Sequence, residues 1–170
     1  AGGGAVAAWA GQLDSEADLV IDAMLGSGLE RDVEGEFALA VAAINSHSGN
    51  VVALYIPTGI HGDTGRVMGF AVRADLTVTF VGLKAGLYLG DGPEYCGAIA
   101  FADLGVPPQC RQALAAAFRR VDDDHMQRTL GPRRRTAHKC DFGHVLVVGG
   151  GPGMPGAVRL CGEAALRAGA

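Results

Sequence analysis

Short apolar runs that stop at glycine or proline recur along the first two thirds of the chain. Runs of this length, bounded by turn residues, are typical of buried strands in a parallel sheet. The pattern therefore predicts four strands, at Ala17–Leu25, Val51–Ile56, Ala74–Leu83 and, more briefly, Ala98–Phe101.

Two helices are predicted, one between the first two strands and one after the fourth. Glu34–Asn45 carries apolar residues at helical spacing, and a proline pair opens a second helix at Pro107–Arg119. The stretch Thr58–Gly69 predicts a long irregular loop. Buried strands separated by helices indicate a parallel sheet with helices on both faces. The fold class predicted for this part is thus α/β, as a Rossmann-like three-layer sandwich.

The pattern changes after residue 120. Val121–Ala137 is charged, contains an arginine run and predicts a linker. His144–Val148 then predicts a new strand, followed by a glycine-rich turn and a helix over Pro155–Ala168. One strand and one helix cannot close a core, so we expect a truncated second domain. The predicted organisation is a domain over 1–120, a linker over 121–137 and the start of another domain over 138–170.

Composition excludes several classes of protein. The hydrophobic share of 49% and charged share of 19% are those of a globular protein, and the net charge of -4 disfavours nucleic-acid binding. No apolar run is long enough for a membrane span. The cysteines form no paired motif, which favours a reduced, cytoplasmic setting. His138–His144 superficially resembles a set of metal ligands, but no second cluster completes a zinc site.

Three segments that could bind a ligand follow predicted strands. They are Asp22–Gly28, Tyr55–Gly59 with the nearby Asp63-Thr64-Gly65, and the stretch from Thr77 to Gly86 that contains Lys84. Ligands bind at the carboxyl ends of strands in open α/β sheets. Taken alone, the first segment is as well explained by a structural turn as by a ligand loop, the second is better explained by an ordinary strand-end turn, and a lone lysine such as Lys84 is usually solvated. The functional interpretation therefore requires the three segments to converge.

An ordered series of motifs supplies a resemblance. The segments DAMLGSG, IPTG with DTG, ADLTVTF with KAG, and GAIAFADLGVP are similar to the NAD(P)H-hydrate epimerase domain. The later segments AHK, GHVLVVGG, GAVRL and GEAALRAGA resemble the opening of the NAD(P)H-hydrate dehydratase. Together they resemble an internal fragment of the bifunctional NAD(P)H-hydrate repair family. The resemblance implies an N-terminally incomplete epimerase domain and the first βα unit of a ribokinase-like dehydratase domain.

The resemblance also implies an activity and its ligands. The family repairs NADH or NADPH that has added water: the epimerase interconverts the R and S hydrates, and the dehydratase removes water from the S hydrate with ADP or ATP. A homo-oligomer is implied, and the dehydratase nucleotide site is expected beyond residue 170. Asp22 and Thr58 are the implied ligands of a potassium ion, whose preference is for hard oxygen donors. The implied substrate contacts are Gly26, Ser27, Gly28, Leu29, Glu30, Arg31 and Asp32, together with Tyr55 and, in the dehydratase part, Ala157.

Three positions depart from the family pattern. Tyr55 stands where the family has aspartate, Thr58 replaces serine, and Cys140 replaces a glycine after His138-Lys139. The usual pKa of tyrosine is about 10 and that of aspartate is about 4. Tyr55 would therefore be a poor base at neutral pH, but it can donate a hydrogen bond. Tyr55 and Lys84 are the candidate catalytic residues.

Two functional hypotheses follow. The first is an epimerase–dehydratase; the alternative is a non-catalytic Rossmann-like binding or interaction module. A generic Rossmann dehydrogenase is disfavoured because no GxGxxG motif is present.

Overall fold

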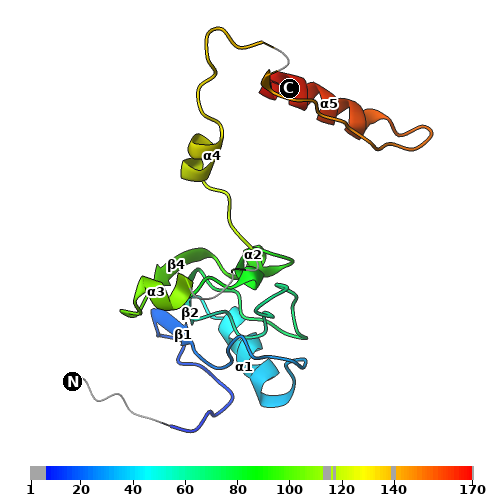
Figure 1. The fold of residues 1–170 in the computed structure, drawn as a ribbon. Coiled ribbons are helices and arrows are strands. Elements are labelled where there is room, and N and C mark those ends of the chain that lie inside the picture. The colour runs from blue at the N-terminus through cyan, green and yellow to red at the C-terminus, as the bar shows by residue number, and fades with distance from the viewer. Residues whose placement is uncertain (1–6, 113–115, 117, 139–140, 170) are drawn as a thin grey trace. The chain divides into compact units, whose positions relative to one another are not determined.

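The computed structural model describes residues 7–112, 116, 118–138 and 141–169, in two compact units. The units comprise residues 1–118 and 119–170 (Figure 1).

A four-stranded parallel sheet forms the centre of the first unit (Figure 1). Its strands are β1 (Leu19–Asp22), β2 (Asn50–Leu54), β3 (Leu76–Phe80) and β4 (Ala98–Ala102), and they lie in that order. Every neighbouring pair is parallel. The four predicted strands and the α/β class are confirmed, although each of the three longer strands is shorter than its apolar run.

Helices connect or follow the strands. Helix α1 (Gly35–Asn45) is confirmed, and α3 (Pro108–Gln112) begins as predicted. Residues 116, 118 and 119 are not helical, so α3 does not continue unbroken to Arg119; residues 113–115 and 117 lie outside the described residues. The sequence patterns missed the short helices η1 (Ala85–Leu87) and α2 (Gly92–Tyr95) between β3 and β4.

One face of the sheet is packed into two apolar clusters. Val41 and Ile44 of α1 pack with the strand residues Val20, Val51 and Ala53. The second cluster pins the long loop after β2 and consists of Ile56, Ile60, Ala71, Leu87 and Cys96. Burial of apolar surface on this face holds the loops against the sheet.

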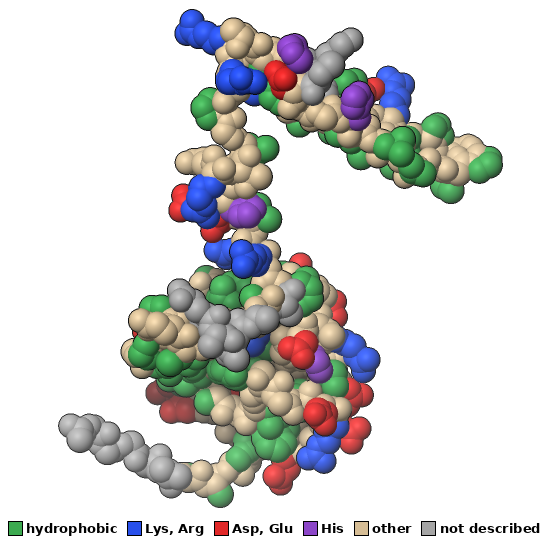
Figure 2. Space-filling model, in the orientation of Figure 1, with side chains coloured by type: hydrophobic (Ala, Val, Ile, Leu, Met, Phe, Trp, Pro, Cys, Tyr) green, Lys and Arg blue, Asp and Glu red, His purple; other side chains and the backbone are tan. Residues whose placement is uncertain are grey.

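The opposite face of the sheet is less covered. Leu19 and Ile21, which point to this face, are 50% and 57% exposed. Figure 2 shows hydrophobic side chains gathered on the side of the first unit where β1 and β4 lie, whereas charged side chains gather on the other side. Within the described residues, helical packing is thus concentrated on one face.

The loop after β2 packs so closely that its glycines cannot be replaced freely. Gly59 has a φ of 94°, and a Cβ there would overlap the carbonyl oxygen of Phe70. Gly65 has a φ of 70°, and a Cβ there would overlap the carbonyl oxygen of Leu89. Only glycine tolerates both conditions without strain, so this loop has a fixed backbone path.

The second unit differs from its prediction in two ways. Helix α5 (Gly156–Ala168) is confirmed, but the predicted strand His144–Val148 is wrong, because none of the described residues of this unit pairs with it as a strand. The predicted linker contains a helix, α4 (Asp123–Thr129). Asp122 starts that helix because its carboxylate accepts the backbone N–H of His125 at 2.8 Å.

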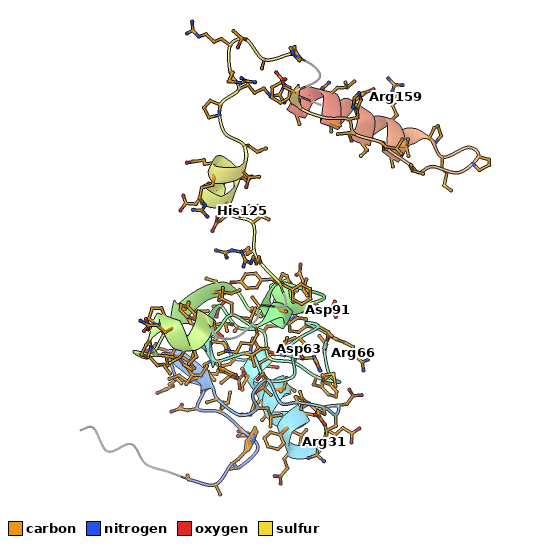
Figure 3. The ribbon with its side chains drawn as sticks, viewed as in Figure 1. Arg31, Asp63, Arg66, Asp91, His125 and Arg159 are labelled. Atoms are coloured by element: carbon orange, nitrogen blue, oxygen red, sulfur yellow. The ribbon has the colours of Figure 1, made fainter. Side chains whose placement is uncertain are left out.

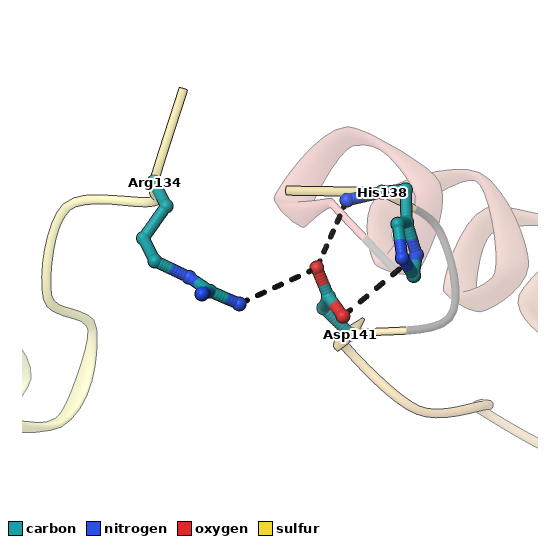
Figure 4. Close-up of polar contacts among 3 residues, drawn as sticks. All are labelled: Arg134, His138 and Asp141. Atoms are coloured by element: carbon teal, nitrogen blue, oxygen red, sulfur yellow. Dashed lines mark hydrogen bonds and ion pairs between the residues drawn. The ribbon is translucent and has the colours of Figure 1, made fainter. Parts of the chain in front are cut away.

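A polar cluster lies between α4 and α5 along the chain (Figure 4). The Asp141 carboxylate accepts the backbone N–H of His138 at 3.1 Å and lies 3.7 Å from both the His138 ring and the Arg134 guanidinium. Arg134 is largely exposed, so this contact contributes little stability. Cys140, the predicted departure next to this cluster, lies outside the described residues. No helix among the described residues is long and apolar enough to cross a membrane.

Candidate active site at the carboxyl edge of the sheet

The loops that follow β1, β2 and β3 meet at one edge of the sheet. These strands are neighbours and parallel, so their carboxyl ends lie side by side. The backbone N–H of Leu25 donates to Thr58 Oγ1 at 3.0 Å, which joins the first two loops. Lys84 Nζ lies 3.5 Å from the centre of the Tyr55 ring, which joins the second and third. The three predicted segments therefore converge.

Asp22 and Thr58 form a buried bridge beneath this edge. Asp22 is 1% exposed and Thr58 is fully buried. One carboxylate oxygen of Asp22 accepts the Thr58 N–H at 2.7 Å, and the other accepts the Thr58 hydroxyl at 2.7 Å. Met24 N–H also donates to the carboxylate, at 3.3 Å. The bridge fixes the end of β1 against the turn after β2.

The same two residues can be tested as potassium ligands. A carboxylate offers about four acceptor positions, and three donors are recorded for Asp22. The Thr58 hydroxyl donates once and accepts once, which leaves one lone pair. Oxygen donors of this kind suit a hard cation. The pair fits as part of a coordination shell and does not complete one.

Tyr55 occupies a strained position directly after β2. Its φ is 77°, a left-handed value that is rare for a bulky side chain. Its N–H donates to Val78 O at 2.7 Å, so the strained backbone is held by β3. Val81, just after β3, also has a left-handed φ, of 63°. Such strain concentrates at functional sites, and here it occurs at two neighbouring strand ends.

The Tyr55 ring spans the three loops. It stacks on Phe80 with ring centres 6.3 Å apart, and a Cβ on Gly26 would lie 3.6 Å from it. The Ser27 hydroxyl donates to the Tyr55 oxygen at 3.2 Å. The half-buried phenol thus presents its oxygen beside the glycine-rich loop.

Lys84 is held by oxygens at the end of β3. Its ammonium donates to Thr79 Oγ1 at 3.1 Å and to the carbonyl oxygens of Phe80 and Gly82 at 2.8 Å each. These contacts use all three of its N–H groups. Burial lowers the pKa of Lys84 below its usual 10.5, and the neighbouring Tyr55 acts in the opposite direction. The ammonium group of Lys84 is therefore held in one position.

The predicted substrate loop Gly26–Asp32 lies on the loop after β2. A Cβ on Gly62 would come within 2.9 Å of Ser27, and one on Gly69 within 3.2 Å of Asp32. Helix α1 begins at Gly35, so its N-terminus does not follow directly after Gly26 and Gly28. Arg31 and Arg66 are exposed side chains of the first unit (Figure 3).

One predicted site residue belongs to the second unit, and the first unit has a cavity that involves none of the predicted site residues. Ala157 is an exposed residue of α5 in the second unit, and its role stays a prediction. A cavity of about 360 Å³ opens beside the carboxyl end of α1, where Ser46, His47 and Ser48 line it together with Leu13. None of the predicted site residues lines this cavity.

The chain was compared with known proteins. The family model described as YjeF-related protein N-terminus matches residues 4–86. Residues 4–86 are thus similar to that family, over a little less than half of the chain. The match extends from before β1 to η1 and includes all three converging loops.

Curated relatives resemble a larger part of the chain. The bifunctional NAD(P)H-hydrate repair enzyme of Coxiella burnetii is 44% identical over 90% of this chain and 31% of its own length. The enzyme of that name from Escherichia coli is 38% identical over 90% of this chain and 30% of its own length. The enzyme of that name from Vibrio cholerae is 36% identical over 99% of this chain and 34% of its own length. The chain thus spans about a third of the length of these relatives.

The structure gives specific roles to two residues inside the predicted stretch from Thr77 to Gly86. Thr79 and Phe80 provide the oxygens that hold Lys84, and both lie in the motif ADLTVTF. A buried threonine inside an apolar strand was the available signal, because a buried hydroxyl needs a partner. The strain at Val81 has no signal in the sequence, since β-branched residues avoid left-handed backbone.

Proposed function

We propose that this chain interconverts the R and S hydrates of NADH and NADPH at the carboxyl edge of its sheet. The observation that carries the proposal is the convergence of three loops on Asp22, Thr58, Tyr55 and Lys84. The names of the relatives support the substrate class. In a longer protein of the relatives' kind, the S hydrate would then be dehydrated with ADP or ATP by the domain to which residues 138–170 contribute.

The proposed roles follow the position of each residue. The loop Gly26–Asp32 would bind the phosphates and sugars of the hydrate through backbone N–H groups and Arg31, because anions favour such donors. Tyr55 would face the hydrated ring, and Lys84 would stay beside the Tyr55 ring. Asp22 and Thr58 would hold potassium beneath it, where the cation would add positive charge next to the dinucleotide.

The activity is tested by following R and S hydrates of NADH or NADPH by chromatography, with and without the chain, in potassium buffer. We expect equilibration faster than the spontaneous rate. R31A should raise KM about 3- to 10-fold with little change in kcat, because one charge-assisted contact to phosphate is lost. R66A is the matched control, an exposed arginine outside the proposed substrate loop. Equilibration at the spontaneous rate would instead favour the non-catalytic binding module.

Potassium is tested without an activity assay. A ligand that binds only the folded state raises the unfolding temperature. We expect a higher melting temperature in potassium chloride than in choline chloride at equal ionic strength, and we expect D22N to lose most of that difference. Equal melting temperatures of the unmodified chain in the two salts would exclude a potassium site at Asp22 and Thr58.

We further propose a cytoplasmic location and a homo-oligomer. Reduced thiols suit the first: Cys96, Cys110 and Cys161 are all free in the structure. Light scattering on the purified chain measures the second, and a monomeric mass at micromolar concentration would contradict it.

A further inference from the structure

The phenol of Tyr55 has the geometry of a proton donor. Ser27 donates its hydroxyl proton to the phenol oxygen at 3.2 Å, so the phenol's own proton remains available for a ligand. Its φ of 77° and its stacking on Phe80 hold the ring in one place at the strand ends. A fixed donor at this edge faces the region where ligands of open α/β sheets bind.

Lys84 has the geometry of a group that acts on Tyr55 and not on a ligand. Its three N–H groups are given to Thr79, Phe80 and Gly82. The ammonium nitrogen nevertheless lies 3.5 Å from the centre of the phenol ring. A cation so close to the ring fixes the ring in place. It also stabilises the negative charge that forms on the phenol when it gives up its proton. Among the described residues, Lys84 is the charged group that contacts the Tyr55 side chain, and the uncharged Ser27 and Phe80 also contact it.

We infer that Tyr55 is the catalytic acid of the epimerisation and that Lys84 is its positioning residue. The inference rests on the proposed function. The R and S hydrates differ at the ring carbon that bears the added hydroxyl. Tyr55 gives its proton to that hydroxyl, which leaves as water with the C–O electron pair, while the ring nitrogen shares its lone pair with the carbon. Water then adds to the opposite face and loses a proton, which restores the phenol through solvent.

The test measures kcat and KM for hydrate equilibration with the full chain. Y55F keeps the ring and removes the acid, so we expect kcat to fall about 100-fold with KM within about 3-fold. K84M should lower kcat about 10-fold, and K84R should recover part of that loss. The double variant Y55F/K84M should match Y55F alone, because Lys84 acts through the phenol proton.

A second tyrosine–cation pair provides the control. The Arg73 guanidinium lies 4.4 Å from the centre of the Tyr95 ring, and Tyr95 lies before β4, away from the carboxyl edge. Y95F and R73M should leave kcat within about 2-fold of the unmodified chain, and their unfolding midpoints reveal the cost of losing such a pair.

The outcomes separate the two claims. Faster equilibration by the unmodified chain together with unchanged kcat in Y55F would overturn the inference and leave the proposed function standing. Losses that multiply, so that Y55F/K84M is about 10-fold worse than Y55F, would show that Lys84 does not act through the phenol. No acceleration by the unmodified chain would overturn both.

Discussion

Replacement of Asp22 tests whether the buried bridge holds the carboxyl edge together. In D22A, the N–H and the hydroxyl of Thr58 lose the acceptors that they reach at 2.7 Å. Thr58 is fully buried, so the folded chain offers these two donors no water in exchange. Hydrogen bonds to a charged group are each worth about 1.5–3 kcal/mol, so the loss of these two in D22A should cost about 3–6 kcal/mol of the free energy of unfolding. That is a large share of the roughly 5–15 kcal/mol typical of a folded domain.

Two matched variants sharpen this prediction. D22N keeps the shape and one acceptor oxygen but places an NH₂ group against one Thr58 donor, so we expect a loss of about 1.5–3 kcal/mol. D103A removes an aspartate that also accepts a backbone N–H, that of Gly105 at 2.9 Å, but in an exposed turn. Water replaces that acceptor, so D103A should lower the free energy of unfolding by only about 0.5 kcal/mol.

Urea unfolding followed by circular dichroism measures all three variants against the unmodified chain. The expected order of stability is D103A, then D22N, then D22A. If D22A unfolded within about 1 kcal/mol of D103A, the bridge would not organise the edge. An equal loss in D22N and D22A would instead attribute the effect to the charge of Asp22 and not to its shape.

Three further predictions concern the packing and titration of single residues. G59A should prevent folding or cost several kcal/mol, because its Cβ would overlap a backbone carbonyl, whereas G28A, with open space around it, should be tolerated; thermal unfolding compares them. Burial raises the pKa of the Cys96 thiol to about 11, which leaves little reactive thiolate at pH 8. An alkylating reagent at pH 8 should therefore modify the exposed Cys161 at least about 100-fold faster than the buried Cys96. Equal rates for the two cysteines, measured by mass spectrometry, would contradict this. The pKa of Lys84 is lower in the folded chain than its usual 10.5. Between the two pKa values the unfolded chain binds more protons than the folded chain does, so the free energy of unfolding increases with pH there. The unmodified chain should therefore gain stability relative to K84M as the pH rises toward 10.5. A constant difference between pH 7 and 10.5 in urea unfolding would refute that.

The strands could be predicted because one face of the sheet is buried. Apolar runs such as Val51–Ile56 stop where the chain turns, and the carboxyl ends of parallel strands share one edge. The convergence of Asp22, Thr58 and Tyr55 follows from that topology. Periodicity overestimated strand lengths, because apolar residues continue into turns that pack against the same core, as Ile56 does.

Other features depend on contacts that no local pattern encodes. Helix α4 is an exception: the Asp122 cap and the acidic first turn are local signals, and they were passed over because the charge of the stretch was interpreted as a linker. The strand predicted at His144–Val148 needs a partner strand, which a run of apolar residues cannot supply. The capture of Lys84 by two carbonyl oxygens arises from the path of the backbone after β3, which depends on the left-handed Val81.

The central claim is that the loops after β1, β2 and β3 form one binding site for the hydrate. Amide chemical shifts of the ¹⁵N-labelled chain, recorded while NADPH hydrate is added, test this directly. We predict that the shifts concentrate in Gly26–Asp32, Tyr55–Gly59 and the turn around Lys84, and saturate together. Shifts confined to the cavity beside Ser46–Ser48, or no saturable shifts in the three loops, would contradict the claim.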